Sequence, residues 1–395
     1  TGKPKGIVHS TGGYLVHNYA TYRWVFNLRE ESVYWCSADV GWVTGHSSGV
    51  YAPLAHGASI VIYEGSPDYP ALDRWWDIIE KYGVTVFYTS PTAIRMFMGA
   101  GEHWPQMHNL STLELLGSVG EPINPEAWLW FYKHVGGERC PIVDTWWQTE
   151  TGGIMISPSP GIERIPLKAG SATFPLPGVS AEVVNEDGTP TPPEQRGYLV
   201  LSKPWPGMLL GVHGNPERYK EAYWSRFPGL YYTGDYAVKD KEGYFWMLGR
   251  ADEVLKVAGH RLGTAELEDA AVSYPKVAEA AVAGKTDPVK GEGIVMFVRL
   301  REGVVPSPEV RDEIARHMRE VIGPIATPDE IYMVSKLPKT RSGKVMRRVL
   351  KAVANDVANI GDLTTLEDES SVEEVVRSYQ EMKKAKNTTK AEQVR

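Results

Sequence analysis

The chain of 395 residues is long enough for two or three domains with hydrophobic cores of their own. Its net charge of −7 argues against general nucleic-acid binding, which needs a basic surface. No apolar run approaches the roughly 20 residues that span a bilayer. Two cysteines, Cys36 and Cys140, cannot form a disulfide framework, and no signal peptide is evident. We therefore expect a cytoplasmic protein that acts on small molecules, without a nucleic-acid or membrane partner.

The chain begins with a loop rich in glycine and lysine, Thr1–Gly6 (TGKPKG), with no strand before it. This loop does not match a Walker A motif, because Pro4 follows Lys3 where Ser or Thr is required. Small residues and two lysines can still surround a polyphosphate with backbone N–H groups, whereas a frayed basic terminus is the plainer interpretation. Because the loop lacks a preceding scaffold, we expect the N-terminal part of a longer protein to be missing.

The first half of the chain alternates strand and helix patterns, which predicts a mainly parallel sheet covered by helices. In chain order we expect strands at Ser32–Val43, Ala58–Tyr63, Val84–Thr89, Leu113–Val119 and Cys140–Asp144, and helices at Leu72–Tyr82, from Pro91 to about Met98 and from Asn124 to about His134. Such sheets bind ligands at the carboxyl ends of their strands. We therefore expect the chemistry near Thr44, at Gly120–Pro122 and at Asp144–Glu150.

The segment Asp144–Gly153 (DTWWQTETGG) is the most informative stretch of the chain. A single tryptophan there would most often be an ordinary core residue. Two adjacent residues of an extended chain point to opposite faces, so at least one of Trp146 and Trp147 should leave the local core. Acidic and hydroxyl residues stand beside them, and the Gly152-Gly153 pair stops regular structure. The pattern favours a lined pocket.

A rival class of enzyme is raised by Gly45–Gly49 (GHSSG), which satisfies the G-x-S-x-G pattern of a nucleophile elbow. It would make the protein an α/β hydrolase with Ser47 as its nucleophile. Five-residue matches are common by chance, and no HGGG-type oxyanion segment accompanies this one. The hydrolase is a remote alternative.

The second half of the chain changes character twice. Prolines and glycines recur at short spacing from about Ser157 to Arg250, which predicts a small β-barrel or sheet. After Asp252 we expect a compact α+β module with helices near Thr264–Ser273 and at Pro308–Ile322 and strands at Val277–Ala283, Ile294–Leu300 and Glu330–Val334. The tail from about Asp362 is charged and low in apolar residues, so a loose helix or disorder is expected. The predicted boundaries are 1–156, 157–251, 252–361 and 362–395.

Several long motifs resemble those of the adenylate-forming (ANL) superfamily, and within it the AMP-forming acetyl-CoA synthetases. They are VYWCSADVGWVTGH, GSVGEPINPEAW, DTWWQTETGG, AGHRLGTAE and LPKTRSGK, in the family's order. The resemblance implies an α/β fold with a parallel-sheet subdomain, a small β-barrel-like subdomain and a mobile α+β C-terminal lid domain. It also implies an acetate–CoA ligase that uses ATP, CoA and Mg²⁺ and passes through an acetyl-adenylate.

The family's nucleotide site transfers onto matching positions of this sequence. The resemblance assigns ATP and AMP contacts to Thr1, Gly2, Lys3, Gly120, Glu121, Pro122, Asp144, Thr145, Trp146, Trp147, Gln148, Thr149, Asp235, Arg250 and Arg261. Glu150 would reach the Mg²⁺ on ATP, since carboxylate suits that hard cation. An isolated arginine is more often a surface ion pair.

Trp147 is expected to close the acyl tunnel, with Val43, Thr44 and Val119 as its other walls. One methylene changes discrimination by about 1–3 kcal/mol, so acetate should be preferred over propionate by tens to a couple of hundred-fold at most. A propionyl-CoA synthetase and an inactive fragment of such a ligase remain alternatives.

The resemblance implies further roles in the second half of the chain. Lys344 would carry adenylation and would be a target of a lysine acetyltransferase and deacetylase, because acetylation removes its charge. Asp252 would be the hinge about which the small domain rotates. CoA contacts would fall to Thr44, Asp68, Ala258, Gly259 and Arg319, and a main-chain cation site to Val272, Tyr274 and Val277. The family commonly has Ser, Asn and His where this chain has Ala258, Asp68 and Tyr274.

Overall fold

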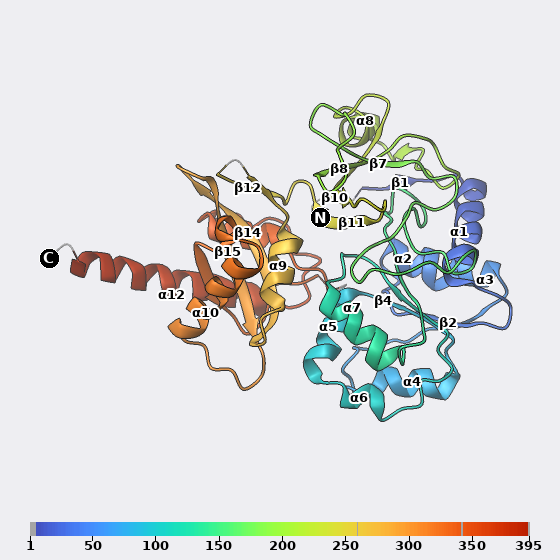
Figure 1. Ribbon diagram of the computed structural model, residues 1–395, viewed down its shortest axis with the longest axis horizontal. Helices are drawn as coiled ribbons and strands as arrows, with labels where there is room; N and C mark the ends of the chain where they lie inside the picture. The colour runs from blue at the N-terminus through green and yellow to red at the C-terminus, as the bar shows by residue number, and fades with distance from the viewer. Residues whose placement is uncertain (1–4, 259, 341–342, 394–395) are drawn as a thin grey trace. The chain divides into compact units, whose positions relative to one another are not determined.

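The structure is a computed structural model that describes residues 5–258, 260–340 and 343–393, with side chains described as far as residue 383. The chain divides into two compact units, of which the N-terminal one ends at Met247 and the C-terminal one begins at Leu248 (Figure 1). Thr1, Gly2, Lys3 and Gly259, all expected in ligand sites, lie outside the described residues.

A five-stranded parallel sheet forms the centre of the N-terminal unit. Its strands run in the order β3-β2-β4-β5-β6, and every pair is parallel. Their bounds are β2 Val33–Cys36, β3 Ser59–Val61, β4 Val86–Thr89, β5 Leu115–Ser118 and β6 Ile142–Asp144. The strands are nearly continuous apolar runs, as expected for a parallel sheet that is buried on both faces.

Helices cover both faces of this sheet, and the alternation of side chains along each strand decides which core each residue joins. Trp35 and Phe87 pack with α4, α5 and α7, whereas Tyr34 and Tyr88 pack with α1 and α3. Figure 1 labels these helices around the strands. The helical segments are α1 Thr11–Phe26, α2 Val43–His46, η1 Ser47–Tyr51, α3 Ala52–Ala55, α4 Arg74–Tyr82, α5 Pro91–Ala100, α6 His103–Gln106, α7 Pro125–Trp130 and η2 Phe131–Val135.

The β-rich part of the N-terminal unit is built on an open sheet. Four strands run in the order β11-β10-β8-β7, and β8 is antiparallel to both of its neighbours. The elements are β1 Ile7–Val8, β7 Ala181–Val184, β8 Arg196–Leu201, β9 Gly211–Val212, α8 Pro216–Tyr223, β10 Tyr231–Lys239 and β11 Phe245–Arg250. The pair β1-β9 adds a small antiparallel sheet. Of the two predicted forms, the sheet is the one present among the described residues.

The C-terminal unit packs helices on both faces of a mixed five-stranded sheet. The order is β13-β12-β15-β14, and β16 pairs with β15 in parallel. Helices α9 and α10 cover one face of the sheet, and α11 and α12 cover the other. The elements are β12 Leu255–Val257, β13 His260–Leu262, α9 Thr264–Val272, β14 Val277–Asp287, β15 Gly291–Leu300, α10 Pro308–Val321, η3 Pro324–Ala326, β16 Glu330–Met333, α11 Arg347–Ala354 and α12 Glu369–Gln393.

One sequence-based expectation about the N-terminal unit was wrong, and one helix was not predicted. The strand predicted at Ser32–Val43 ends at Cys36, because the following residues turn and then enter α2. Helix α1 was missed altogether. Its buried residues include His17, Asn18 and Thr21, so its inward face does not stand out as an apolar stripe in the sequence.

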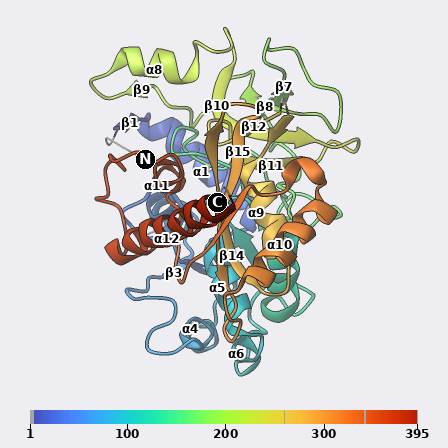
Figure 2. The same cartoon turned by 90° about the vertical axis from the view of Figure 1, so that its left-hand side faces the viewer.

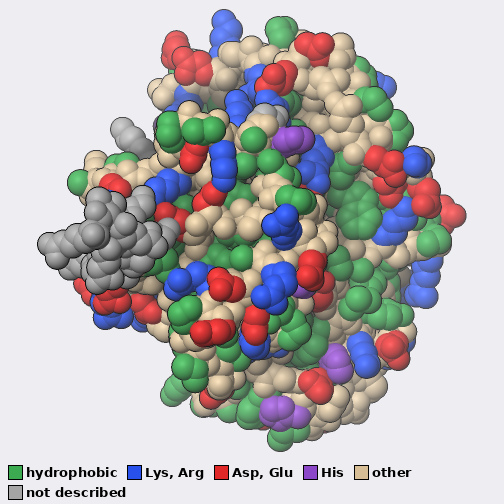
Figure 3. Space-filling model, turned by 60° about the vertical axis from the view of Figure 1, so that its left-hand side comes forward, with side chains coloured by type: hydrophobic (Ala, Val, Ile, Leu, Met, Phe, Trp, Pro, Cys, Tyr) green, Lys and Arg blue, Asp and Glu red, His purple; other side chains and the backbone are tan. Residues whose placement is uncertain are grey.

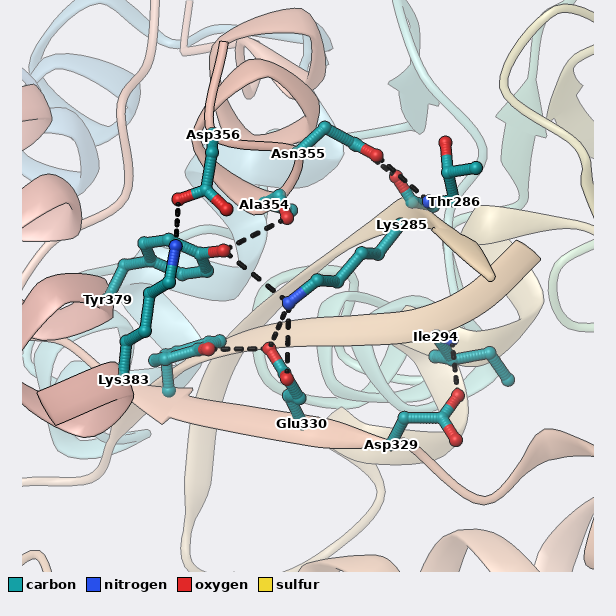
Figure 4. A network of polar contacts seen from close by, with 12 residues as sticks. Lys285, Thr286, Ile294, Asp329, Glu330, Ala354, Asn355, Asp356, Tyr379 and Lys383 are labelled. Atoms are coloured by element: carbon teal, nitrogen blue, oxygen red, sulfur yellow. Dashed lines mark hydrogen bonds and ion pairs between the residues drawn. The ribbon is translucent and has the colours of Figure 1, made fainter. Parts of the chain in front are cut away.

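The charged tail is a packed helix over its first half. Helices α11 and α12 belong to the same unit (Figure 2), and Val375 and Tyr379 of α12 are buried in the core that also contains Leu350 of α11. The Tyr379 hydroxyl donates to the Ala354 carbonyl at 3.2 Å, and Lys285 Nζ donates to that hydroxyl at 3.4 Å (Figure 4). The expectation of a loose or disordered tail was therefore wrong here, since a few apolar residues at helical spacing suffice.

Acidic and basic side chains are interspersed over the face that Figure 3 presents. Charged side chains of the described residues form ion pairs, such as Lys383 with Asp356 at 2.7 Å and Lys290 with Asp329 at 2.5 Å. Within the described part of the chain, no helix combines the length and the apolar character that crossing a membrane requires. Both cysteines are free and buried.

We expect Val375→Asp to release α12 from the C-terminal unit. Val375 has no exposed surface, and a carboxylate buried there without a partner would cost several kcal/mol. Amide hydrogen exchange over residues 369–383 should rise strongly in this variant and stay unchanged in Glu373→Ala, whose side chain is exposed on the same helix. Equal exchange in the two variants would show that the helix does not depend on this packing.

Candidate active site

The expected site begins where β5 and β6 end side by side. Ser118 pairs in register with Asp144, and the Thr145 backbone N–H donates to the Ser118 carbonyl at 3.0 Å. Trp146 then forms an isolated antiparallel bridge with Ile156, so the segment between them is a closed loop. The carboxyl edge of the sheet therefore holds the motif segment, as the strand pattern predicted.

The paired glycines of the loop are required by close packing. Gly152 has φ +72°, and a Cβ there would lie 2.3 Å from the Gly207 carbonyl oxygen. A Cβ on Gly153 would lie 2.5 Å from the ring of His17. Asn18 Nδ2 donates to the Gly152 carbonyl at 2.6 Å. Helix α1 thus supports the loop, and burial lowers the pKa of His17 to about 4, so this ring is neutral near pH 7.

Trp146 points toward the β-rich part of the unit and fixes an acid there. Its indole N–H donates to Asp235 Oδ2 at 3.0 Å, and Gln148 Nε2 donates to the same oxygen at 2.8 Å. Gln148 is itself held by the Tyr231 hydroxyl, which donates to its Oε1 at 3.1 Å. The structure therefore brings three predicted nucleotide residues together.

Trp147 points the other way, as the alternation along an extended segment requires. It is partly exposed and packs against the core that contains Val119 and Tyr88. Its indole N–H donates to the Tyr88 hydroxyl at 3.2 Å. Val43 and Thr44 open helix α2, and the described members of this core include neither of them.

Glu150 is a nearly buried carboxylate held by two partners. Lys5 Nζ and the Tyr223 hydroxyl donate to its Oε1 at 2.7 and 2.6 Å. Burial raises the pKa of this carboxyl, but the Lys5 charge and the two hydrogen bonds outweigh that effect and hold the pKa below its ordinary value. Glu150 is therefore anionic at neutral pH. The neighbouring Thr149 is exposed, and its carbonyl accepts a hydrogen bond from His9 Nε2 at 2.7 Å.

The segment Gly120–Pro122 leaves β5 through a turn in which Gly120 has φ +100°. Glu121 forms an ion pair with Arg95 Nη2 at 2.9 Å and accepts a hydrogen bond from the Thr92 hydroxyl. Both partners lie on α5, so the segment is tied to the helix that follows β4. A side chain held in this way keeps the main chain at the sheet edge in one position.

The rival hydrolase site is not formed. Ser47 opens the helical turn η1 directly after α2 and is fully buried, whereas a nucleophile elbow presents its serine at an exposed turn between strand and helix. Its hydroxyl is hydrogen-bonded to the Tyr14 hydroxyl. The G-x-S-x-G match is therefore a coincidence of sequence.

In the C-terminal unit, Lys344 is exposed at the end of a tight loop. The Thr340 N–H donates to the Lys344 carbonyl at 2.8 Å, and the Lys344 N–H donates to Thr340 Oγ1 at 3.2 Å. Gly343 has φ +83° in this turn. Because its main chain is anchored on both sides, Lys344 carries its charge on a defined base.

Other predicted residues of this unit lie on its surface. Arg250 Nε pairs with the exposed Asp252 at 3.3 Å. Ala258 has φ +47°, a conformation that costs a residue with a Cβ about 1–2 kcal/mol, and its N–H donates to the Lys290 carbonyl at 2.8 Å. Arg261 lies on β13 opposite Lys256 of β12.

The remaining predictions concern CoA and a main-chain cation. Arg319 is exposed in the last turn of α10. In the N-terminal unit, Asp68 is exposed in the loop after β3 and accepts from the Ser66 hydroxyl.

Two of the three main-chain carbonyls expected at the cation site, those of Tyr274 and Val277, have partners within the chain. The Val277 carbonyl accepts from Arg301 Nε at 3.2 Å, and the Tyr274 carbonyl accepts from the Val277 N–H at 2.9 Å. Val272 ends α9 close by. The described residues contain no cluster of three or more His, Cys, Asp or Glu side chains that could hold a metal ion.

Sequence reasoning missed the residues that hold the predicted ones in place, among them Lys5, Tyr88 and Tyr223. Lys5 belonged to the recognised loop, but its partner lies 145 residues away. Tyr88 could have been suspected, because it is a hydroxyl next to the carboxyl end of a predicted strand. Nothing in the sequence around Tyr223 indicates its contact with Glu150.

A parallel sheet covered on both faces, with aromatic and acidic side chains beyond its carboxyl edge, is the architecture of α/β enzymes that bind nucleotides. The chain belongs to the AMP-binding enzyme family. The family's model matches residues 1–211, and the model of the AMP-binding enzyme C-terminal domain matches residues 266–344.

Curated relatives carry the name acetyl-coenzyme A synthetase. The protein of that name from Pyrobaculum aerophilum is 63% identical over 383 residues, which are 97% of this chain and 57% of the relative. The one from Chlorobaculum tepidum is 54% identical over 94% of this chain and 56% of its own length. The chain thus spans little more than half the length of these relatives.

Solved structures of acyl-CoA ligases share the fold. Acetoacetyl-CoA synthetase from Streptomyces lividans matches with a TM-score of 0.83 at 25% identity, over 97% of this chain and 58% of that one. The anthranilate CoA ligase AuaEII in complex with anthranoyl-AMP matches with a TM-score of 0.80 at 28% identity, over 90% of this chain and 66% of that one.

The buried carboxyl of Asp144 makes a pH-dependent contribution that can be measured. Burial raises its pKa from 3.8 to about 7, and the Ser118 hydroxyl offsets part of the rise. Between about pH 4 and about pH 7 the folded chain therefore holds a proton on Asp144 that the unfolded chain releases. The free energy of unfolding falls as pH rises through this range, by on the order of 4 kcal/mol once the pH is above both pKa values.

We expect Asp144→Asn to remove this dependence, because an amide stays neutral throughout. Urea unfolding of the N-terminal unit at pH 5 and pH 7 should show a larger loss of stability for the wild type than for the variant. Asp77→Asn, in a half-exposed ion pair with Arg74 on α4, should keep the wild-type loss. An unchanged loss in Asp144→Asn would contradict the raised pKa.

Proposed function

We propose that this chain carries the nucleotide and acyl sites of an AMP-forming acetate–CoA ligase. The observation that carries the proposal is the division of labour between two adjacent indoles: Trp146 fixes Asp235, and Trp147 faces the opposite side beside Val119. The same segment therefore positions the Asp235 carboxylate, which suits ribose hydroxyls, and the Trp147 ring, which would shorten the acyl slot. The names of the curated relatives support acetate as the acid, and the anthranoyl-AMP of the related ligase supports an acyl-adenylate route.

In the proposed reaction, an acetate oxygen attacks the α-phosphorus of ATP, and the bond to the bridging oxygen of pyrophosphate breaks. The sulfur of CoA then attacks the acetyl carbonyl, loses its proton, and AMP leaves. No side-chain nucleophile is required, so the site works by positioning its substrates and by stabilising charge. We assign the positive charge for adenylation to Lys344.

The fixed contacts support the roles that we propose for the residues around the nucleotide. Asp235, held by Trp146 and Gln148, would accept the ribose hydroxyls, and the anchored Gly120–Pro122 segment would pack on adenine. Asp144, Thr145 and Thr149 complete the segment that lines the nucleotide. In the other unit, Arg250 and Arg261 would contact ribose or phosphate oxygens.

Glu150 fits a magnesium ion that is shared with ATP. A single anionic carboxylate is the contribution that a protein commonly makes to Mg²⁺ bound with substrate phosphates. Its lowered pKa keeps it ionised, and Lys5 and Tyr223 hold one of its oxygens in place. When bound, the ion would neutralise charge on the departing pyrophosphate.

The remaining assignments belong to CoA binding and regulation. We propose Thr44, Asp68, Ala258, Gly259 and Arg319 as CoA contacts and Asp252 as the hinge of a lid domain over residues 252–361. Val272, Tyr274 and Val277 would form a main-chain cation site, and Lys344 would be the residue whose acetylation silences adenylation, since acetylation removes its charge. Propionate is the second candidate acid.

Acetate-dependent exchange of pyrophosphate into ATP tests the proposed function, because only an adenylating enzyme shows it. We expect Lys344→Ala to lower this exchange by on the order of 10²–10³ while added acetyl-AMP and CoA still react. Lys351→Ala, which removes an exposed lysine of α11, serves as the control.

The assay should be run on the 395-residue chain and on the chain extended to the length of its relatives. Exchange in Lys344→Ala equal to that of Lys351→Ala would refute the role of Lys344. Absence of exchange in both chain lengths would refute the ligase.

Trp147→Gly should admit longer acids, because it removes the ring that faces the acyl slot. One methylene is worth about 1–3 kcal/mol in such a pocket, so butyrate should gain at least tenfold relative to acetate in kcat/KM. Hydroxamate trapping of the activated acids measures the preference. Trp130→Gly removes a partly buried tryptophan beside another core and should leave the preference unchanged. A Trp147→Gly enzyme that still rejects butyrate would show that the pocket lies elsewhere.

A further inference from the structure

We propose that Tyr88 is the positioning residue that fixes the indole of Trp147 and thereby sets the length of the acyl slot. This inference rests on the proposed function, since it names the residue that holds the specificity wall in place. Tyr88 lies one residue before the carboxyl end of β4, and it is fully buried.

A chain of hydrogen bonds joins the ends of three neighbouring strands. The Trp147 indole N–H donates to the Tyr88 hydroxyl at 3.2 Å, and that hydroxyl lies 2.5 Å from Thr145 Oγ1. The Thr145 hydroxyl donates to the Ser118 carbonyl at 2.9 Å. These three hydrogen bonds, called the relay below, run from the motif loop to β4, back to the start of that loop and on to the end of β5.

The direction of every proton in this chain follows from the chemistry of its members. An indole nitrogen can only donate, and a carbonyl can only accept. Since Thr145 has one hydroxyl proton and gives it to Ser118, the Tyr88 hydroxyl must give its own proton to Thr145. The Tyr88 oxygen is then the acceptor that faces Trp147. Bonds aligned head to tail in this way strengthen one another.

The ring of Tyr88 has little freedom to move away. A Cβ on Gly117, its partner in the register of β4 and β5, would lie 2.5 Å from the Tyr88 ring, so the ring occupies the space that this glycine leaves. Phe26 borders the same space and packs edge to face with the Tyr88 ring, with centroids 4.8 Å apart. Burial raises the pKa of Tyr88 well above its ordinary value, so the hydroxyl keeps its proton at working pH.

Trp147 needs such an anchor more than the other tryptophan of the motif. Trp146 is buried in its core, whereas Trp147 is partly exposed and can tilt on the side that packing does not restrict. A hydrogen bond from the edge of the ring removes that freedom. Without it, the ring can swing and the slot behind it can lengthen.

The chain offers a matched control in Tyr34. It lies on β2, the neighbour of β4, within the same core, and it is equally buried. Within the described residues its hydroxyl has no hydrogen-bond partner. Tyr34→Phe therefore removes the same oxygen from the same core without touching the relay.

The first experiment observes the Trp147 indole directly in the 395-residue chain. The peak of its N–H among the 13 tryptophans in a ¹H–¹⁵N spectrum is the one lost in Trp147→Phe. We expect Tyr88→Phe to shift this peak and to speed its exchange with solvent at least tenfold, whereas Tyr34→Phe leaves it unchanged. A peak that stays in place in Tyr88→Phe would overturn the proposal.

The second experiment measures acid preference in the enzyme that shows acetate-dependent exchange. We expect Tyr88→Phe to lower the ratio of kcat/KM for acetate to that for propionate about three- to tenfold, with Tyr34→Phe at the wild-type ratio. Trp147→Phe removes the donor at the other end of the bond. Its effect and that of Tyr88→Phe should not add, because both break the same contact.

Additive effects, or equal ratios in Tyr88→Phe and Tyr34→Phe, would overturn the proposal. If Tyr88→Phe does not fold, Trp147→Phe is compared with the wild type instead. An unchanged ratio of kcat/KM for acetate to that for propionate in Trp147→Phe would overturn the proposal. A wild type without exchange would refute the ligase instead, and the indole peak would still decide whether Tyr88 positions Trp147.

Discussion

The register of the parallel strands β4, β5 and β6 is the constraint on which the site depends. It pairs Thr89 with Ser118 and Ser118 with Asp144, so three strands end at one level. The loop that leaves β6 can then reach back to the Ser118 carbonyl and forward to Asp235. A slip of one residue in any of these pairings would turn every side chain to the other face and separate these groups.

Buried polar groups keep the loop in one conformation. Glu150, Asn18 and Gln148 each find partners from distant parts of the chain, and each would be costly to bury without them. The same contacts leave Trp147 as the motif tryptophan on the partly exposed side. A site that positions its substrates, without a side-chain nucleophile, requires this kind of rigidity.

The C-terminal unit is also a sheet whose two faces are buried under helices. A mixed sheet is covered on both faces, and α12 completes the second face through Val375 and Tyr379. Charged residues around Tyr379, such as Lys285 with Glu330 at 3.3 Å, tie the helix to the sheet (Figure 4). The exposed Lys344 thus belongs to a firmly packed unit.

The amino-acid sequence by itself determined the alternation of strands and helices that gives a mainly parallel sheet, the carboxyl-edge location of Asp144–Glu150, the opposite orientation of Trp146 and Trp147, and the family. These depend on local periodicity and on long motifs. Only the tertiary structure decided that α1 is a helix with a polar buried face, that α12 packs, and that Ser47 is buried. Only the tertiary structure shows that Lys5 and Tyr223 are the partners of Glu150, and that Trp147 is hydrogen-bonded to Tyr88. The reason is physical: hydrogen bonds between residues tens to hundreds of positions apart form only when the strands have been brought into register, and no local pattern records them.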